Sequence, residues 1–396
     1  MCSSDLIFLA NDSTLWIYSP DGSRLLASTP HPNGISALTV TASGLAYLLG
    51  LGTPLFSTTN GSQPCYMNLA EPFFGGYPPR PGVLAVIDVS GKTRYATFLQ
   101  EAIVSPGLVT ISPVDGRPYG IGSTFPYSPP FGNYWTGILA FDTAGFPEGG
   151  IFAGCLAHSA TLASSAIAPG ALITIIGEKL GPDTGVSYTP ENGRIPFNVA
   201  GTSVTVDGMP APILYAQSRQ INFVTPWGIR TDGARIPVCA KFSDATSCFY
   251  AETAAAAPGF FNVGDSTAAT NEDGTANSRD NPAHPGSYVL LYMTGAGPLT
   301  DAVPDGGIAD LVPKWLTASA TVKMATLPGI CIRVVCPKEF PADTLYAGWV
   351  PTWTNGAQVL IIRLPLNSYS GSPWVEAAFD AGNLHATALG HIYIAP

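Results

Sequence analysis

Short apolar stretches separated by Gly, Pro and Asp recur along the whole chain. In residues 166–253 they are "ALITIIG", "TSVTVDG", "APILYAQ", "QINFVTP" and "RIPVCAKF", each close to the length of one β-strand. Of the 396 residues, 43 are glycine and 37 are proline. Because both residues interrupt helices, turns must be frequent and long amphipathic helices scarce. The pattern predicts an all-β protein.

The strand pattern of residues 166–253 occurs again later in the chain. "APGALITIIGEKLGP" at 168–182 and "HPGSYVLLYMTGAGP" at 284–298 share a Pro-Gly pair, an apolar run and a Gly-Pro pair at identical spacing. The tripeptide "LYA" then occurs at Leu214 and again at Leu345. A gapless match of this kind indicates a duplicated structural unit rather than one catalytic loop.

Short strands between Gly and Pro turns are typical of immunoglobulin-like β-sandwiches. We therefore predict two tandem sandwiches, the first at residues 166–253 and the second at 284–396. Residues 254–283 are small and polar and are expected to form an ordered connector between them. Residues 154–165 are expected to be a linker to the N-terminal region.

A looser repeat occupies residues 1–153. "ISALTVTASGLAYLLG" (35–50) and "GLVTISPVDGRPYGIG" (107–122) each give an alternating strand, a glycine turn and a second strand with a tyrosine. Four short antiparallel strands in about 55 to 70 residues suit a β-propeller blade. The chain opens at the second strand of a repeat, so about two and two-thirds blades are expected. They would be completed by sequence upstream of Met1 or by another chain.

The charge and hydropathy of the chain exclude some classes of binding partner. The net charge is -10 at pH 7 and only 17 Lys and Arg are spread along the chain, so no nucleic-acid partner is expected. The apolar runs are far shorter than the roughly 20 residues of a membrane-spanning helix. The start, "MCSSDLIFLAND", lacks the basic and long apolar regions of a secretory signal, which means that export is absent or that the true start is missing.

Seven cysteines bear on the cellular compartment. Two pairs, separated by "AKFSDATS" and "IRVV", could each face across a hairpin, and a third bridge would leave Cys2 as the odd residue. Disulfides would imply an oxidising compartment. The alternative is that the thiols are reduced and buried. The spacing of the cysteines argues against a zinc site. The predicted disulfide pairs are Cys239–Cys248, Cys331–Cys336 and Cys65–Cys155.

Several motifs from the duplicated region occur in a fixed order: "IAPGALITIIGEKLGP", "VTVDGMPAPILYAQSRQINFVTPW", "APGFF", "NEDGTANSRDNPAHPGSYVLLYMTGAGP" and "LYAG". Together, over residues 164–396, they resemble the C-terminal domain of secreted acidobacterial (Solibacter-type) proteins, a family with no established activity. The first half is also similar to the immunoglobulin-like IPT/TIG module. The resemblance implies a secreted protein in which this domain follows an NHL-like β-propeller. Residues 326–343, with their extra cysteine pair, depart from the family pattern.

The usual catalytic motifs do not occur in the chain. We find no G-x-S-x-G elbow, no H-E-x-x-H, no Walker loop and no G-x-G-x-x-G after a strand. Two carboxylates that meet only in space, as in glycosidases, leave no sequence signature. We expect no enzymatic activity, and calcium is the one cofactor that the sequence offers a reason to consider.

Two acidic, glycine-containing stretches could bind calcium. They are "NEDGTANSRDN" at 271–281 and "DAVPDGGIAD" at 301–310. Hard cations favour such oxygen ligands, although the spacing is not that of an EF-hand loop. The alternative is a set of Asx turns, in which the side chains cap their own backbone. The candidate ligands are Asn271, Asp273, Asp301 and Asp305.

Two stretches rich in aromatic residues and proline are expected to be long loops of the propeller. "EPFFGGYPPRPG" lies at 71–82 and "FPYSPPFGNYWTG" at 125–137. Rings held by prolines can stack on sugars or peptides at low entropic cost. The alternative is that the loops pack against a blade edge or a neighbouring domain. The candidate binding residues are Phe73, Phe74, Tyr77, Tyr127, Phe131, Tyr134 and Trp135.

These observations predict a non-catalytic extracellular or cell-surface protein with a structural or adhesive role. Low charge and many β edges would allow strands of different copies to pair into oligomers or filaments. The partners would be copies of itself, other cell-surface proteins or glycans. The alternative function is an extracellular carbohydrate-binding or carbohydrate-cleaving protein that uses the aromatic loops.

Overall fold

The structure is a computed structural model of the chain. It describes residues 6–11, 13–30, 34–51, 82–99, 105–114, 117–124, 135–140, 151–162, 165–264, 266–325, 339–366, 373–381 and 384–396. All regular elements in these ranges are β-strands, which confirms the all-β prediction. Among the same residues no helix is long and apolar enough to cross a membrane. The chain forms two compact units, residues 1–67 with 71–155 and residues 68–70 with 156–396, and each is described by itself.

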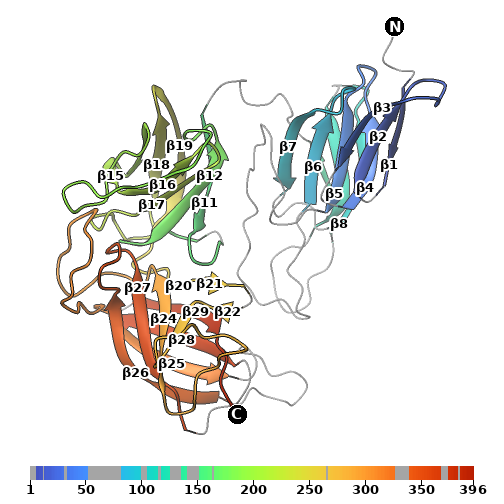
Figure 1. Cartoon of the computed structure of the whole chain (residues 1–396). Helices are drawn as coiled ribbons and strands as arrows, with labels where there is room; N and C mark the ends of the chain where they lie inside the picture. Colours follow the sequence, from blue (N-terminus) through green and yellow to red (C-terminus); the bar gives the residue numbers. More distant parts are fainter. Residues whose placement is uncertain are drawn as a thin grey trace. The chain divides into compact units, whose positions relative to one another are not determined.

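The described residues of the first unit form three antiparallel meanders, coloured blue to cyan in Figure 1. The first meander has the strand order β1-β2-β3, the second β4-β5-β6-β7 and the third β10-β9-β8. Their bounds are β1 (Ile7–Ala10), β2 (Thr14–Tyr18), β3 (Leu25–Pro30), β4 (Gly34–Val40), β5 (Ala46–Leu51), β6 (Gly82–Ile87), β7 (Thr93–Leu99), β8 (Ser105–Ile111), β9 (Pro118–Thr124) and β10 (Trp135–Ala140).

The second meander is buried on both faces because its strands are almost continuously apolar. β5 reads "AYLLGL", β6 reads "GVLAVI", and nearly all of these side chains are buried. One face packs against Leu15 and Ile17 of β2, and the other packs against Val109 of β8. The three meanders are therefore stacked face to face.

The turns between these strands use the Asp and Gly residues of the repeat. Asp88 accepts hydrogen bonds from the backbone N–H groups of Ser90 and Lys92, and Gly91 has a φ of 82°, where glycine is strongly favoured. Burial raises the pKa of Asp88, but hydrogen bonds from Ser90, Lys92 and Arg94 outweigh it and hold the pKa at about 2. Among the described residues the first two meanders have the three and four strands expected of consecutive blades, whereas the third has three instead of four. The β-propeller itself stays a prediction.

The second unit contains two modules. The first module is built from two sheets, with the strand orders β11-β12-β17-β16-β13 and β15-β14-β18-β19. Its strands are β11 (Phe152–His158), β12 (Leu172–Glu178), β13 (Val186–Ser187), β14 (Thr202–Val206), β15 (Met209–Ala211), β16 (Ile213–Gln217), β17 (Gln220–Val224), β18 (Arg235–Phe242) and β19 (Ala245–Glu252).

The second module is a single eight-stranded sheet with the order β20-β24-β27-β26-β25-β28-β29, in which β23 also pairs with β24. Its two layers, β24-β27-β26 and β25-β28-β29, enclose one core that includes Leu291, Leu360, Met324 and Phe379. Its strands, together with the separate β21-β22 hairpin, are β20 (Gly259–Phe260), β21 (Asn262–Val263), β22 (Ser266–Thr267), β23 (Ala269–Asn271), β24 (Tyr288–Thr294), β25 (Ser319–Ala325), β26 (Glu339–Trp349), β27 (Gln358–Arg363), β28 (Trp374–Ala381) and β29 (Leu384–His391).

The topology confirms the duplication. The order β12-β17-β16 in the first module corresponds to β24-β27-β26 in the second, and β14-β18-β19 corresponds to β25-β28-β29. The repeated "LYA" has a structural meaning, because the register shifts at Leu214 and again at Leu345, where each strand carries one extra residue. The same bulge in the same strand fixes the alignment of the two modules.

The second module differs from the expected sandwich in having one continuous sheet. β26 pairs with β25 through residues 339–342 and with β27 through residues 343–349, so it passes from one layer to the other. In the first module Pro212 lies between β15 and β16 at the matching place, and because proline lacks an N–H, the strand is interrupted there. At the other end of the sheet β29 lies close to β20, since a Cβ at Gly390 would lie 3.1 Å from the Phe260 ring, so the sheet nearly closes into a barrel.

The two modules are joined by buried hydrogen bonds. Thr294 Oγ1 of the second module accepts the N–H of Leu172 at 2.9 Å and donates to the carbonyl of Gly356 at 2.7 Å. The backbone N–H of Trp227 donates to Asp305 Oδ1 at 2.8 Å, and the Trp227 side chain packs against the second core. The first module is thereby fixed to the second.

Candidate functional site

The outer face of the layer β24-β27-β26 gathers large apolar side chains. The odd-numbered residues of β24 belong to the core, so Leu290 and Tyr292 lie on the opposite face. The register places Ile361 of β27 beside Leu290, and Tyr346 of β26 beside Ile361. We call this surface the aromatic face; it comprises Leu290, Tyr292, Tyr346 and Ile361, together with Trp315 and Trp353 from the adjoining loops.

Trp353 is held on the aromatic face by a short loop between β26 and β27. The loop folds back on itself, with the N–H of Val350 donating to the carbonyl of Ala357 at 3.0 Å. The Trp353 indole lies nearly parallel to the Tyr292 ring, with an interplanar angle of 6° and 5.5 Å between the centroids. Half of Trp353 (50%) is exposed. Because Tyr292 covers one side of the indole, the exposed half lies on the other side.

Trp315 is held by Tyr346 in a different geometry. Its indole meets the Tyr346 ring edge to face, with centroids 4.8 Å apart and an angle of 71°, and it too is 50% exposed. The Tyr346 hydroxyl donates to the carbonyl of Lys314 at 2.8 Å, and burial raises the pKa of this hydroxyl, which keeps it a donor. A Cβ at Gly348 would collide with the Lys314 carbonyl and the Tyr346 ring, so this close approach requires glycine.

The distance between Tyr292 and Tyr346 gives the length of the aromatic face. Tyr292 and Tyr346 lie two strands apart and are offset by two residues along the strands. With ordinary strand spacing and rise, their Cα atoms are about 12 Å apart. A surface of this length, with an exposed indole on each tyrosine, suits an extended ligand better than a compact one.

The first module carries polar residues at two of the four corresponding sheet positions. The pair Thr174–Asn222 occupies the positions that correspond to Leu290–Ile361. Thr174 Oγ1 donates to Asn222 Oδ1 at 3.1 Å, and Gln220 Nε2 donates to the same oxygen at 2.8 Å. Leu290 and Ile361 are therefore replaced by polar residues in the first module. Tyr292 and Tyr346, by contrast, correspond to Ile176 and Tyr215.

The aromatic residues expected to bind a ligand in the first unit are not placed by the structure. Of the seven, Trp135 begins β10, and nothing is described of its side chain. That prediction therefore stays a prediction. The six that lie outside the described residues are Phe73, Phe74, Tyr77, Tyr127, Phe131 and Tyr134.

Two of the four calcium candidates form hydrogen bonds at the end of β23 and in the turn that follows it. Asn271 Oδ1 accepts from Asn277 Nδ2 at 2.9 Å, and Asn277 also donates to the carbonyl of Tyr393 at 2.8 Å. Asp273 accepts the side-chain O–H and the backbone N–H of Thr275, and these hydrogen bonds lower its pKa. Asp273 therefore forms an Asx turn, whereas the side-chain oxygen of Asn271 accepts from another side chain.

The other two candidates have partners elsewhere. Asp301 pairs with the ammonium of Lys314 at 3.1 Å, and Asp305 accepts from the backbone of Trp227 at the junction between the modules. In the part of the chain that the structure describes, no three His, Cys, Asp or Glu side chains gather as metal ligands. Calcium binding stays a prediction.

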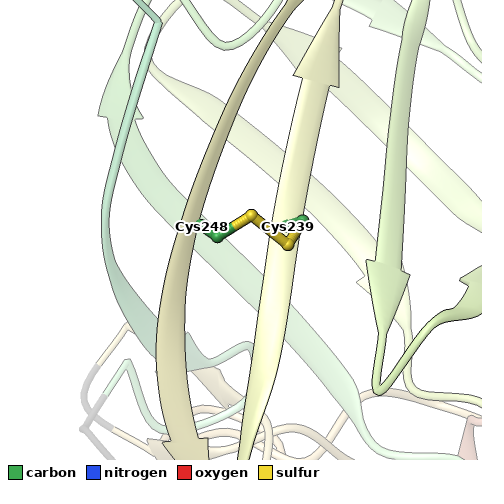
Figure 2. Close-up of a disulfide and its surroundings, with 2 residues drawn as sticks. All are labelled: Cys239 and Cys248. Atoms are coloured by element: carbon green, nitrogen blue, oxygen red, sulfur yellow. A yellow bond between two sulfur atoms is a disulfide. The ribbon is translucent and has the colours of Figure 1, made fainter.

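One of the predicted disulfides is confirmed. Figure 2 shows Cys239 of β18 and Cys248 of β19 joined across the hairpin. The register places the two residues directly opposite each other, with Cα atoms 4.1 Å apart. Cys155 is also disulfide-bonded. The remaining cysteines of the predicted pairs, Cys65, Cys331 and Cys336, lie outside the described residues, as does Cys2.

His158 is the one buried histidine among the described residues, and it lies at the junction between the modules. It is 2% exposed, and neither ring nitrogen makes a hydrogen bond, although the Ala257 and Thr294 backbones lie nearby. A Cβ at Gly259 would lie 2.6 Å from the ring, which shows how closely the second module packs on it. Burial lowers the pKa of His158 to about 4, so the ring is neutral at pH 7.

A cleft of about 500 Å³ opens in the first unit beside β1 and β4. Its lining carries no ionisable side chain, and the hydroxyl of Thr41 is engaged with Ser43 and the backbone of Leu45. The cleft therefore offers no ionisable group for acid or base chemistry. It is lined by Leu6, Phe8, Leu38, Thr39, Val40, Thr41 and Ala42.

No family model and no curated protein matches the chain. The solved structure of SGBP-B from a complex xyloglucan utilization locus in Bacteroides uniformis is similar over 62% of this chain, with 12% identity and a TM-score of 0.19, and this chain spans 49% of its length.

Two further solved structures are similar in part. The C-terminal domain of the Streptococcus agalactiae AgI/II polypeptide BspA matches 59% of this chain and 95% of its own, at 8% identity and a TM-score of 0.18. A "Putative membrane anchored protein" from Corynebacterium diphtheriae matches 99% of this chain and 91% of its own, at 10% identity and a TM-score of 0.16. TM-scores this low establish no shared fold, so the function is argued from the residues.

Proposed function

We propose that the chain is a non-catalytic, secreted or cell-surface adhesive protein that binds an extended saccharide on the aromatic face. The observation that carries this proposal is the pair Trp315 and Trp353, each braced by a tyrosine of one sheet face and each half exposed. An aromatic ring presents a flat apolar surface to the C–H face of a sugar ring. Braced rings lose little conformational entropy on binding.

The disulfides support an oxidising location. Cross-linked cysteines persist in secreted and cell-surface proteins, and both Cys239–Cys248 and the bonded Cys155 are of this kind. The motif resemblance to secreted acidobacterial proteins agrees with the same location.

The scaffold holds the two indoles firmly. The tyrosines that brace the two indoles lie on regular strands, and sites on strands are held more firmly than sites on free loops. The buried Thr294 hydrogen bonds fix the module that carries the aromatic face to its neighbour. The surface works by shape and stacking, with no acid or base in it.

The proposal is tested on a glycan array with the whole chain and the variants Trp353→Ala and Trp315→Ala. Tyr250→Ala is the matched control, since Tyr250 is 63% exposed but lies on β19 of the first module. Binding that either tryptophan variant weakens more than tenfold, and the control leaves intact, supports the proposal. Absence of any saccharide binding would contradict it.

Two further readouts separate the alternatives. Binding lost in Trp135→Ala and retained in Trp353→Ala would place the site in the first unit. Release of smaller saccharides from a bound polysaccharide would show an enzyme and contradict the non-catalytic proposal.

A further inference from the structure

The outward side of the first meander is an apolar face. The register pairs Ile7 with Tyr18 and Leu9 with Trp16, and all four lie on the side opposite to the buried Leu15 and Ile17. Ile7 is 38% exposed and Leu9 is 52% exposed. No charged residue occurs in β1, β2 or β3. We call this surface the first outer face; it comprises Ile7, Leu9, Trp16, Tyr18 and Leu25.

The outward side of the third meander is apolar as well. Leu108 of β8 pairs with Ile121 of β9, which pairs with Ile138 of β10, in one row across the sheet. Leu108 is 50% exposed and Ile138 is 67% exposed, whereas Val109 on the other side is buried. The strands β8, β9 and β10 contain no charged residue. We call this row the third outer face.

The interior of the same unit shows what covers such a surface. The inner sides of the first and third meanders are each covered by the second meander, through rows of alternating apolar residues. An exposed row of isoleucine, leucine and aromatic side chains on a sheet is costly in water. The first and third outer faces carry apolar rows of the same kind as these inner sides. Within the described residues, however, no sheet covers them.

From this continuity we propose that two copies of the chain pair head to tail through their first units. The first outer face of each copy packs on the third outer face of the other. The result is a closed ring of six meanders, twice the three of one copy, and six lies within the range of about four to eight sheets found in propellers. The proposal goes beyond saccharide binding, because it uses a different unit and none of the residues of the aromatic face.

A head-to-tail pair predicts a specific response to charges placed on the two outer faces. The interface joins two different surfaces, so one copy contributes the first outer face to one contact and the third outer face to the other. A charge placed on either surface therefore disrupts both contacts of a uniform pair. Now suppose that one copy carries a positive charge on its first outer face and the other carries a negative charge on its third outer face. These two charges meet in one contact, and the second contact keeps its original residues.

The test measures the mass of the whole chain by light scattering across a range of concentrations. The expected mass is twice the 41.2 kDa of one chain. Leu9→Lys and Ile138→Glu should each shift the mass to that of one chain. Val114→Lys is the matched control, because Val114 is 93% exposed in the turn after β8 and lies on neither outer face. Far-UV circular dichroism of each variant verifies that its strands are retained.

Mixing the variants distinguishes this pair from other associations. An equimolar mixture of Leu9→Lys and Ile138→Glu should recover the doubled mass, since the introduced ammonium of one copy then meets the introduced carboxylate of the other. A single-chain mass for the unmodified protein at all concentrations would overturn the proposal. Failure of the mixture to recover the doubled mass, or an open series of larger masses, would overturn the closed head-to-tail arrangement.

Discussion

Acidification is expected to destabilise the second unit through His158. The ring is buried at the junction between the modules, and its pKa in the folded chain is about 4, compared with 6.5 for an exposed histidine. Between these two values the unfolded chain binds a proton that the folded chain does not. This stabilisation is therefore fully present above pH 6.5 and is lost as the pH falls towards 4.

The size of the effect follows from the two pKa values. Proton linkage gives a loss of about 2 kcal/mol in the free energy of unfolding between pH 7.5 and pH 5, and about 3 kcal/mol once the pH is below 4. Between pH 7.5 and pH 5 the lowered pKa values of Asp21 and Asp88 do not interfere, because their stabilisation is lost only as the pH falls below the ordinary value of 3.8.

Urea unfolding at pH 7.5 and pH 5 measures this difference directly. The His158→Gln variant removes the titrating ring, so it should lose about 2 kcal/mol less than the unmodified chain over the same interval. His284→Gln is the control, since His284 is exposed at the surface of the same unit. Equal losses in the unmodified chain and in His158→Gln would refute the reasoning.

Two further perturbations test the packing of the second unit. Replacing both Cys239 and Cys248 by serine should lower the free energy of unfolding by about 3 kcal/mol, because the chain between them is freed in the unfolded state; urea unfolding under non-reducing conditions checks this, and an unchanged midpoint would contradict it. Thr294→Val should lower the free energy of unfolding by about 3 kcal/mol, since the buried N–H of Leu172 and the carbonyl of Gly356 both lose their hydrogen-bond partner. Thr317→Val, on a more exposed hydroxyl of the same module, should cost far less; equal losses for the two valine variants would contradict the account of the junction.

The duplication could be predicted from the sequence because its signals are local. Turn residues and alternating apolar positions repeat at fixed spacing, and "LYA" marks the same bulge at Leu214 and Leu345. The joining of the two layers in the second module could not be predicted in this way. It depends on the residue that passes between the layers, which is Pro212 in one module and Asp343 in the other.

The aromatic face could not be predicted from the sequence pattern. Trp315 and Trp353 are far apart in the chain, and only the pairing of β24, β27 and β26 brings their tyrosine supports onto one surface. The only sequence signal was the concentration of tryptophan in "GWVPTWTNG" at residues 348–356. Asp305 illustrates the opposite error: its acidic, glycine-rich surroundings resemble a cation loop, yet its carboxylate accepts the backbone N–H of Trp227 from the other module.

The central claim is that this protein acts through the aromatic face. The most direct measurement is the dissociation constant of an array-selected saccharide, titrated into the whole chain and into Trp353→Ala. The account predicts a dissociation constant more than tenfold larger for the variant, with the strands of both proteins retained in far-UV circular dichroism. An unchanged dissociation constant in a folded Trp353→Ala variant would contradict it.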